Sequence, residues 1–170
     1  MSRPNQGHEA SKAAARLLSL RFELDDLTRP EVIRLLEEHL QEMYATSPAE
    51  SVHALDLDAL RAPAISFWSA WDANSLAGCG ALKRLTGEDV EVKSMRTARA
   101  SRGRGVGSAV LAHLLGEARR CGYRRVLLET GSQEFFDPAR RLYARHGLTE
   151  RPPFYDYVED HNSVFMELRL

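Results

Sequence analysis

The chain has 170 residues, a length that suits one domain with a sizeable hydrophobic core. Its apolar share of 44% and charged share of 28% are ordinary for a globular protein, and its formal net charge is −1. This balance predicts neither a nucleic acid nor an anionic membrane surface as partner. No apolar run is long enough to span a bilayer.

The N-terminus and the cysteines predict a cytoplasmic protein. The first twelve residues are polar and lack the apolar core of a signal peptide. Cys79 and Cys121 have no metal-ligand spacing, so we expect two buried thiols, which fit a reducing compartment, and no metal site.

The first half of the chain predicts a strand, two helices and three consecutive strands. Residues 1–19 form an N-terminal extension with an Ala/Leu-rich, helix-favouring part, and residues 20–170 form one domain. We expect Thr28 to cap the first helix, with Glu31 completing a capping box. The expected elements are a strand at 21–24, helices from 30 and at 56–61, and strands at 65–71, 75–85 and 89–97. Within the last of these strands, Val90 and Val92 should face one side, and Glu91, Lys93, Met95 and Thr97 the other.

The second half alternates strands and helices. After a loop at 98–105, Val106, Val110, Leu111, Leu114, Leu115 and Ala118 form one apolar helical stripe. A buried strand follows at 124–130, and a helix in which Asp137 is the N-cap and Pro138 the first helical residue. Gly147 supplies the C-cap of that helix, and residues 163–168 form a last strand.

The loop Arg102-Gly103-Arg104-Gly105-Val106-Gly107-Ser108 predicts an anion site. Alternate glycines let the backbone turn with positive φ and let another molecule approach. The following helix adds unpaired N–H groups and its positive dipole end, which suit a phosphate or pyrophosphate. The alternative is a solvated turn that only connects two elements.

Two known nucleotide-binding loops fit this stretch poorly. A Walker A loop needs a lysine before Ser108, and Gly107 stands there. A dinucleotide loop needs a third glycine where Ser108 stands, directly after a strand, with an acid about 20 residues on. Glu129 could mimic that acid, but a run of three strands precedes the loop where an alternating β/α series is expected.

The pattern that fits is [Arg/Gln]-x-x-Gly-x-[Gly/Ala] between a strand and an amphipathic helix, filled by Arg102, Gly105 and Gly107. The segment from Ala139 to Leu148, with Leu142, Tyr143 and Gly147, matches A-x-x-L-Y-x-x-x-G-[FL]. With both motifs in this order, the chain resembles the GNAT superfamily of acyl-CoA-dependent N-acyltransferases over about residues 21–170. The resemblance implies an α/β (α+β) fold: a mixed, mostly antiparallel central sheet with a splayed strand pair, flanked by helices.

The resemblance also implies acetyl-CoA as cosubstrate, without a metal. The turn from Arg102 to Gly107 would cradle the CoA pyrophosphate, Ser108 would add an amide or hydroxyl, and the strand end would pair with the pantetheine arm. The implied cosubstrate residues are Met95, Arg96, Thr97, Arg102, Gly103, Arg104, Gly105, Val106, Gly107 and Ser108. The family often has an asparagine where Phe136 stands, which removes one expected polar contact.

Two residues are implied to carry the catalysis. Tyr143 matches the tyrosine that protonates the departing thiolate, and its alternative is a core tyrosine. Glu91, eleven residues before Arg102, matches a general-base glutamate that acts directly or through water; its alternative is an exposed strand glutamate paired with Lys93 or Lys83. His53, His146 and His161 are weaker candidates for the base.

The resulting hypothesis is an N-acetyltransferase acting on a primary amine of a small molecule, by direct attack in a ternary complex. The acidic and aromatic run at 154–160 would suit a cationic acceptor, or is a solvated loop. The alternatives are an acyl-CoA-binding or regulatory module without turnover, and a protein or peptide N-acetyltransferase. The basic loop is too short to predict nucleic-acid binding. The acceptor, the acyl length and the oligomeric state, a homodimer included, are left open.

Overall fold

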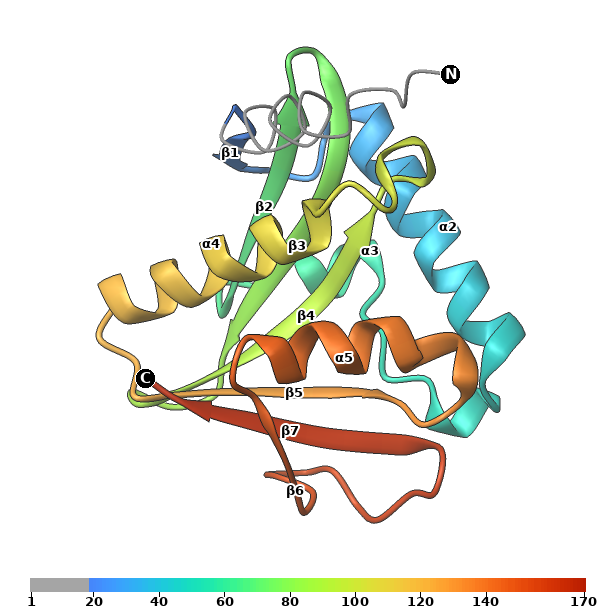
Figure 1. Cartoon of the computed structure of the whole chain (residues 1–170), viewed down its shortest axis with the longest axis vertical. Coiled ribbons are helices and arrows are strands. Elements are labelled where there is room, and N and C mark those ends of the chain that lie inside the picture. Colours follow the sequence, from blue (N-terminus) through green and yellow to red (C-terminus); the bar gives the residue numbers. More distant parts are fainter. Residues whose placement is uncertain (1–18) are drawn as a thin grey trace, which may run out of the picture.

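A seven-stranded sheet forms the centre of the protein in a computed structural model that describes residues 19–170 (Figure 1). The expected extension at 1–19 falls, apart from Ser19, outside the described residues. The strand order is β1-β2-β3-β4-β5-β7-β6, and only the β4–β5 pair is parallel. The bounds are β1 Arg21–Leu24, β2 Ile65–Asp72, β3 Ser75–Arg84, β4 Asp89–Thr97, β5 Arg125–Gly131, β6 Thr149–Arg151 and β7 Ser163–Arg169.

Helices cover both faces of this sheet. One apolar cluster joins the stripe of α4 (Val106–Arg120) and Tyr143 of α5 (Asp137–Arg145) to one face. A second cluster joins α2 (Pro30–Thr46) and α3 (Leu57–Leu60) to the other face. Three short turns complete the chain: η1 Ala49–Ser51, η2 Arg99–Ser101 and η3 Glu134–Phe136. The predicted fold class is therefore confirmed, as is the apolar stripe of α4, whose six members are all buried.

Several local predictions were wrong. Thr28 does not cap α2, because its hydroxyl donates to Asp26 Oδ1 at 2.6 Å, and Arg29 holds the N-cap position without a side-chain bond. Asp137 is the first residue of α5 rather than its cap, since the preceding η3 places Phe136 at the N-cap. Strand β6, with only three residues, gave no periodic signal. Cys121 is exposed, whereas Cys79 is buried as expected.

The splayed strand pair is β4 and β5. Their parallel pairing covers only Asp89–Arg125, Val90–Val126 and Glu91–Leu127, although β4 continues to Thr97 and β5 to Gly131. Figure 1 shows the two strands leaving a common corner and diverging. Beyond Glu91, the facing edges of the two strands offer backbone groups that the parallel ladder does not use.

A β-bulge in β4 changes the face on which its last residues lie. Ala81 of β3 faces Lys93 while Cys79 faces Arg96, so Ser94 and Met95 together oppose Gly80. Ser94 takes a positive φ of 53° at this place. The extra residue shifts the alternation by one, so Met95 packs with Val90 and Val92 against α4 and not with Lys93 as the strict period predicted.

The bulge also turns Arg96 toward α2, where it meets Glu42. Arg96 Nη1 donates to Glu42 Oε2 at 2.5 Å, and the Arg96 side chain is only 8% exposed. Arg102 and Arg99 lie 3.7 and 4.0 Å from the same carboxylate. The hydrogen bond from Arg96 lowers the pKa of Glu42 to about 2. Glu42 therefore links α2 to β4 and to the loop before α4.

We expect Glu42→Gln to lower the free energy of unfolding at pH 7 by about 1–3 kcal/mol, because a charge-assisted bond to a buried guanidinium is lost. The folded-state pKa of Glu42 is depressed, so this stabilisation is present above the ordinary value near 4.5 and is lost as pH falls through about 2. Urea unfolding at pH 7 and pH 3 measures both effects. Glu38→Gln, an exposed position on the same helix, is the control and should change little. An equal loss in the two variants, or a pH-independent one, would contradict the assignment.

Candidate active site

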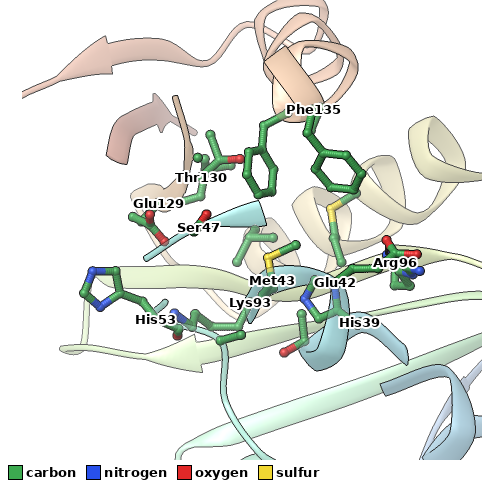
Figure 2. Close-up of a pocket in the computed structure, with 18 of the residues that line it drawn as sticks. His39, Glu42, Met43, Ser47, His53, Lys93, Arg96, Glu129, Thr130 and Phe135 are labelled. Atoms are coloured by element: carbon green, nitrogen blue, oxygen red, sulfur yellow. Dashed lines mark hydrogen bonds and ion pairs between the residues drawn. The ribbon is translucent and has the colours of Figure 1, made fainter. Parts of the chain in front are cut away.

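A cavity of about 500 Å³ lies where β4 and β5 diverge (Figure 2). One part of its lining comes from Gly107 of α4 and from Leu142 and Tyr143 of α5, on one face of the sheet. The other part comes from α2, from the segment that follows it and from β4 on the opposite face, and includes His39, Glu42, Met43, Ser47, His53 and Lys93. The cavity is therefore lined from both faces of the sheet.

The glycine-rich turn before α4 adopts the geometry of an anion site. Gly103 and Gly105 have φ of 71° and 81°, a region that favours glycine, and Gly105 is the N-cap of α4 without any side-chain cap. The N–H of Ala109 makes the first bond back to the turn, to Gly105 O at 3.1 Å. The N–H groups of residues 106–108 thus stand at the positive end of the helix dipole, as the first N–H groups of any helix do.

The predicted cosubstrate residues divide into two groups. Met95, Arg96, Thr97, Arg102 and Gly107 line the cavity. Gly103, Arg104, Gly105, Val106 and Ser108 belong to the turn and the helix start but are not lining residues.

The side chains of this second group fix the turn to its neighbours. Arg104 Nη2 donates to Asp72 Oδ2 at 3.0 Å, Val106 is buried in the core, and Ser108 Oγ lies 2.7 Å from His146 Nε2 at the end of α5. The last of these contacts joins the two expected motifs near their C-terminal ends, because His146 follows α5 and Ser108 follows the last glycine of the loop.

Gly107 approaches its neighbours closely. A Cβ placed on it would lie 3.3 Å from Leu142 Cδ2 and 3.4 Å from Thr97 Oγ1. Glycine therefore keeps the helix start, β4 and α5 in contact and leaves the amides open to the cavity.

Tyr143 projects from α5 into both the core and the cavity. It packs in the main apolar cluster and also lines the cavity, so the core and catalytic interpretations describe the same placement. Burial raises the pKa of Tyr143 to about 12, and the nearby Glu129 carboxylate adds to the effect. The hydroxyl therefore keeps its proton at neutral pH and can donate it.

Glu91 lies beneath the cavity and is not one of its lining residues. It is 2% exposed, its Oε1 accepts from the Tyr157 hydroxyl at 2.6 Å, and Lys93 Nζ is 3.4 Å from the same atom. Lys93 Nζ also donates to His53 O at 3.0 Å and to Tyr157 Oη at 2.9 Å. Glu91 therefore has no direct contact with the cavity. Its burial excludes an exposed strand glutamate, but the pairing with Lys93 that the same alternative named is present.

The aromatic run at 154–160 does not border the cavity. Tyr155 donates to Asp89 Oδ2 at 2.5 Å and Tyr157 bonds to Glu91, so the run is anchored against β4. The His53 ring meets the Tyr157 ring edge to face at 5.0 Å, and His53 itself lines the cavity. The run thus packs behind the lining residue His53 without lining the cavity itself.

Sequence reasoning missed most of the residues that line the cavity on the face of the sheet covered by α2. His39 and Glu42 come from α2, Ser47 follows α2 directly and Glu129 comes from β5, and only strand register and helix packing bring them together. Burial, with Arg96 nearby, lowers the pKa of His39 to about 4, and burial, with Lys93 nearby, lowers the pKa of His53. Both imidazoles are therefore neutral at neutral pH.

Phe136, in place of the expected asparagine, also lines the cavity. Its ring meets that of Phe135 edge to face at 5.0 Å, and Phe135 stays 50% exposed at the cavity. A Cβ on Gly131 would overlap the Phe136 ring, so the glycine at the end of β5 makes room for it. The lining gains apolar surface where the family often has an amide.

The part of the chain that the structure describes contains no helix long and apolar enough to cross a membrane. Within residues 19–170 there is also no group of three or more His, Cys, Asp or Glu side chains placed to hold a metal ion.

Comparison with known proteins identifies relatives over most of the chain. Residues 30–148 match the model of the acetyltransferase (GNAT) family. An uncharacterized N-acetyltransferase of Bacillus subtilis, YsnE, is 50% identical over 89% of this chain and 100% of its own length. An IAA acetyltransferase of Azospirillum brasilense is 39% identical over 80% of this chain and 88% of its own.

Solved structures share the fold. An acyl-CoA N-acyltransferase structure from Klebsiella pneumoniae superimposes with a TM-score of 0.72 at 26% identity, covering 89% of this chain and 98% of that one. A Bacillus subtilis acetyltransferase in complex with CoA gives 0.64 at 17% identity, covering 89% and 99%. Family match, relatives and fold agree with the geometry of the loop and the splayed strands: the chain belongs to the acetyltransferase (GNAT) family and is an acyltransferase.

Proposed function

We propose that this acyltransferase moves an acetyl group from acetyl-CoA to a primary amine of a small molecule, in a ternary complex. The observation that carries the proposal is the cavity between the diverging strands β4 and β5, lined by Arg102 and Gly107 of the glycine-rich turn on one face of the sheet and by polar side chains on the other. Two substrates could enter such a cavity from opposite faces and meet inside the sheet.

The residues at the turn fit the CoA end of the donor. The N–H groups at the start of α4 and the guanidinium of Arg102 suit a pyrophosphate. The unpaired edge of β4 near Met95 and Thr97 suits the amide-containing pantetheine arm, which would extend the sheet into the gap. Structures of similar fold described as complexes with CoA or acetyl-CoA support the same donor.

Names of relatives support a small acceptor. The Azospirillum brasilense relative is called an IAA acetyltransferase, and one structural neighbour is an aminoglycoside 6′-acetyltransferase. The three cations that line the cavity, Lys93, Arg96 and Arg102, are ion-paired with Glu91 or Glu42, which leaves the pocket polar without a large positive charge. The sequence features that indicate a reducing compartment support a cytoplasmic location.

The chemistry follows from the groups on the lining. The amine nitrogen attacks the thioester carbonyl carbon, the C–S bond breaks, and Tyr143 gives its proton to the thiolate sulfur. No cysteine is among the lining residues, which favours direct transfer over a covalent acyl-enzyme. The sequence-based assignment of Glu91 as base would require a relay through Lys93 or Tyr157, since Glu91 lies outside the lining.

The test is a screen of acceptors with acetyl-CoA, following release of free thiol. We expect turnover with free primary amines or amino acids and none with peptides or lysine-rich proteins. Turnover of peptides alone would replace the small acceptor with a peptide. Tight acetyl-CoA binding without thiol release from any acceptor would favour a binding or regulatory module.

We expect Gly107→Asp to weaken acetyl-CoA binding by at least tenfold, because it places a carboxylate and a tight Cβ beside the proposed pyrophosphate site. Calorimetric titration measures the affinity. Gly116→Asp adds the same charge to the same helix at an exposed position with nothing within 4 Å, and should leave the affinity within about twofold. Similar affinities for the two variants would contradict the pyrophosphate assignment.

Tyr143→Phe should lower kcat by about 10²–10⁴-fold while acetyl-CoA affinity stays within a few-fold, because only the donated proton is lost. Since the pKa of Tyr143 is about 12, we expect no alkaline loss of wild-type activity from this group below about pH 10. Thiol release, calorimetry and thermal unfolding on one preparation measure the three quantities. A fall in rate that merely follows a fall in stability would assign Tyr143 to the core alone.

A further inference from the structure

We infer that Glu129, on β5, receives the ammonium group of the acceptor and takes its first proton. This inference rests on the proposed function and names the residue of the same site that would select an amine. Neither the family match nor the names of the relatives assign a role to this position.

The register of β5 places Glu129 on the face opposite Tyr143. Leu128 packs in the cluster that contains Tyr143, whereas Leu127 packs with Phe154 and Phe165 on the other side. Because alternate residues of a strand face opposite ways, Glu129 shares the side of Leu127, and its partner across the ladder is Phe165. It is half-buried and lines the cavity, so a ligand in the cavity can touch it.

Glu129 lies just beyond the last β4–β5 pair. The parallel ladder ends at Glu91–Leu127, and Glu129 follows two residues later, where the gap has opened. Figure 2 shows its carboxylate on the same side of the cavity as His53 and Ser47. A proton donor on one face and a carboxylate on the other therefore flank the gap in which the thioester would lie.

The cations that line the cavity are paired with other carboxylates, so Glu129 is the lining carboxylate that remains available to a cationic ligand. Lys93 has Glu91 as its carboxylate partner, and Arg96 and Arg102 share Glu42. Within residues 19–170, Glu129 has no ion pair within 4.0 Å. A partly buried carboxylate without a cationic partner is costly, and the ammonium group of an acceptor would supply that partner.

The charged and titratable groups around Glu129 set how it holds a proton. Burial raises its pKa. The nearby Ser163 hydroxyl of β7 and the Lys93 charge of β4 oppose this rise, whereas the charges of Glu91 on β4 and of Asp160 in the loop before β7 reinforce it. In turn, Glu129 adds to the raised pKa values of Tyr143 on α5 and of Tyr157. Both tyrosines stay protonated at neutral pH, so Glu129 changes charge before either of them.

The proton balance of the transfer is complete with these groups. The acceptor ammonium gives one proton to Glu129, and the neutral nitrogen attacks the thioester carbon. As the C–S bond breaks, Tyr143 protonates the sulfur, and the second proton of the nitrogen restores the Tyr143 hydroxyl. Glu129 then releases its proton to water, so the products are an acetamide, the CoA thiol and one proton.

The test compares wild type, Glu129→Gln and the control Glu150→Gln, an exposed glutamate on β6. With the most reactive amine of the acceptor screen, we expect Glu129→Gln to lower kcat/KM about 10²-fold at pH 7. The rate of this variant should then rise with pH as the ammonium group of the amine loses its proton in solution, whereas wild type reaches a plateau. Acetyl-CoA affinity should be unchanged in both variants. A kcat/KM within threefold of wild type, or an unchanged pH profile, would overturn the inference.

A second measurement does not depend on turnover. In protein labelled with ¹³C at the glutamate carboxyl, the Glu129 signal is identified by its loss in Glu129→Gln. In the CoA complex, we expect the titration midpoint of Glu129 to lie at a higher pH than that of an exposed glutamate. Benzylamine should lower this midpoint, because it places a cation beside the carboxylate. An ordinary midpoint that benzylamine does not move would overturn the inference. If no amine is acetylated, the proposed function fails, and this titration still decides whether Glu129 binds an ammonium group.

Discussion

The parallel pairing of β4 with β5, and its end after Glu91–Leu127, is the constraint on which the site depends. A parallel pair within a mostly antiparallel sheet needs a crossover, and α4 supplies it, so the glycine-rich turn necessarily lies at the end of β4. The opening of the pair leaves unpaired backbone edges and a cavity lined from both faces of the sheet. The glycine-rich turn, the gap and the polar pocket on the α2 face are thus consequences of one interrupted ladder.

The two faces of the sheet carry different chemistry because different helices cover them. On the face of α4 and α5, the cavity meets apolar side chains, backbone amides and a protonated tyrosine. On the face of α2, it meets neutral imidazoles and the carboxylates of Glu42 and Glu129, of which Glu42 is ion-paired with Arg96. The bulge at Ser94 connects these environments, since it sends Met95 toward α4 and Arg96 toward Glu42. This arrangement gives the cavity a different set of chemical groups on each face of the sheet.

Sequence patterns predicted the secondary-structure elements and the glycine-rich loop, but not the residues that line the cavity on the α2 face of the sheet. The stripe of α4 and the positive φ values of Gly103 and Gly105 follow from local rules, because side-chain period and glycine freedom are properties of short segments. The face on which Met95 lies does not follow from local rules, because the β-bulge before it depends on the pairing with the partner strand. Glu91 and Glu129 looked alike as strand acids, yet Tyr157 and Lys93 close over the first while the open gap leaves the second accessible. Such differences arise from contacts between distant segments, which no local pattern contains.

The most direct test of the account is a crystal structure of the protein with CoA. The account predicts the pyrophosphate on the N–H groups at the start of α4, and the sulfur in the gap between β4 and β5, near Tyr143. It also predicts main-chain hydrogen bonds between the pantetheine arm and residues 95–97. CoA bound outside the gap, or a gap closed by continued β4–β5 pairing, would contradict the claim that the interrupted ladder forms the transfer site.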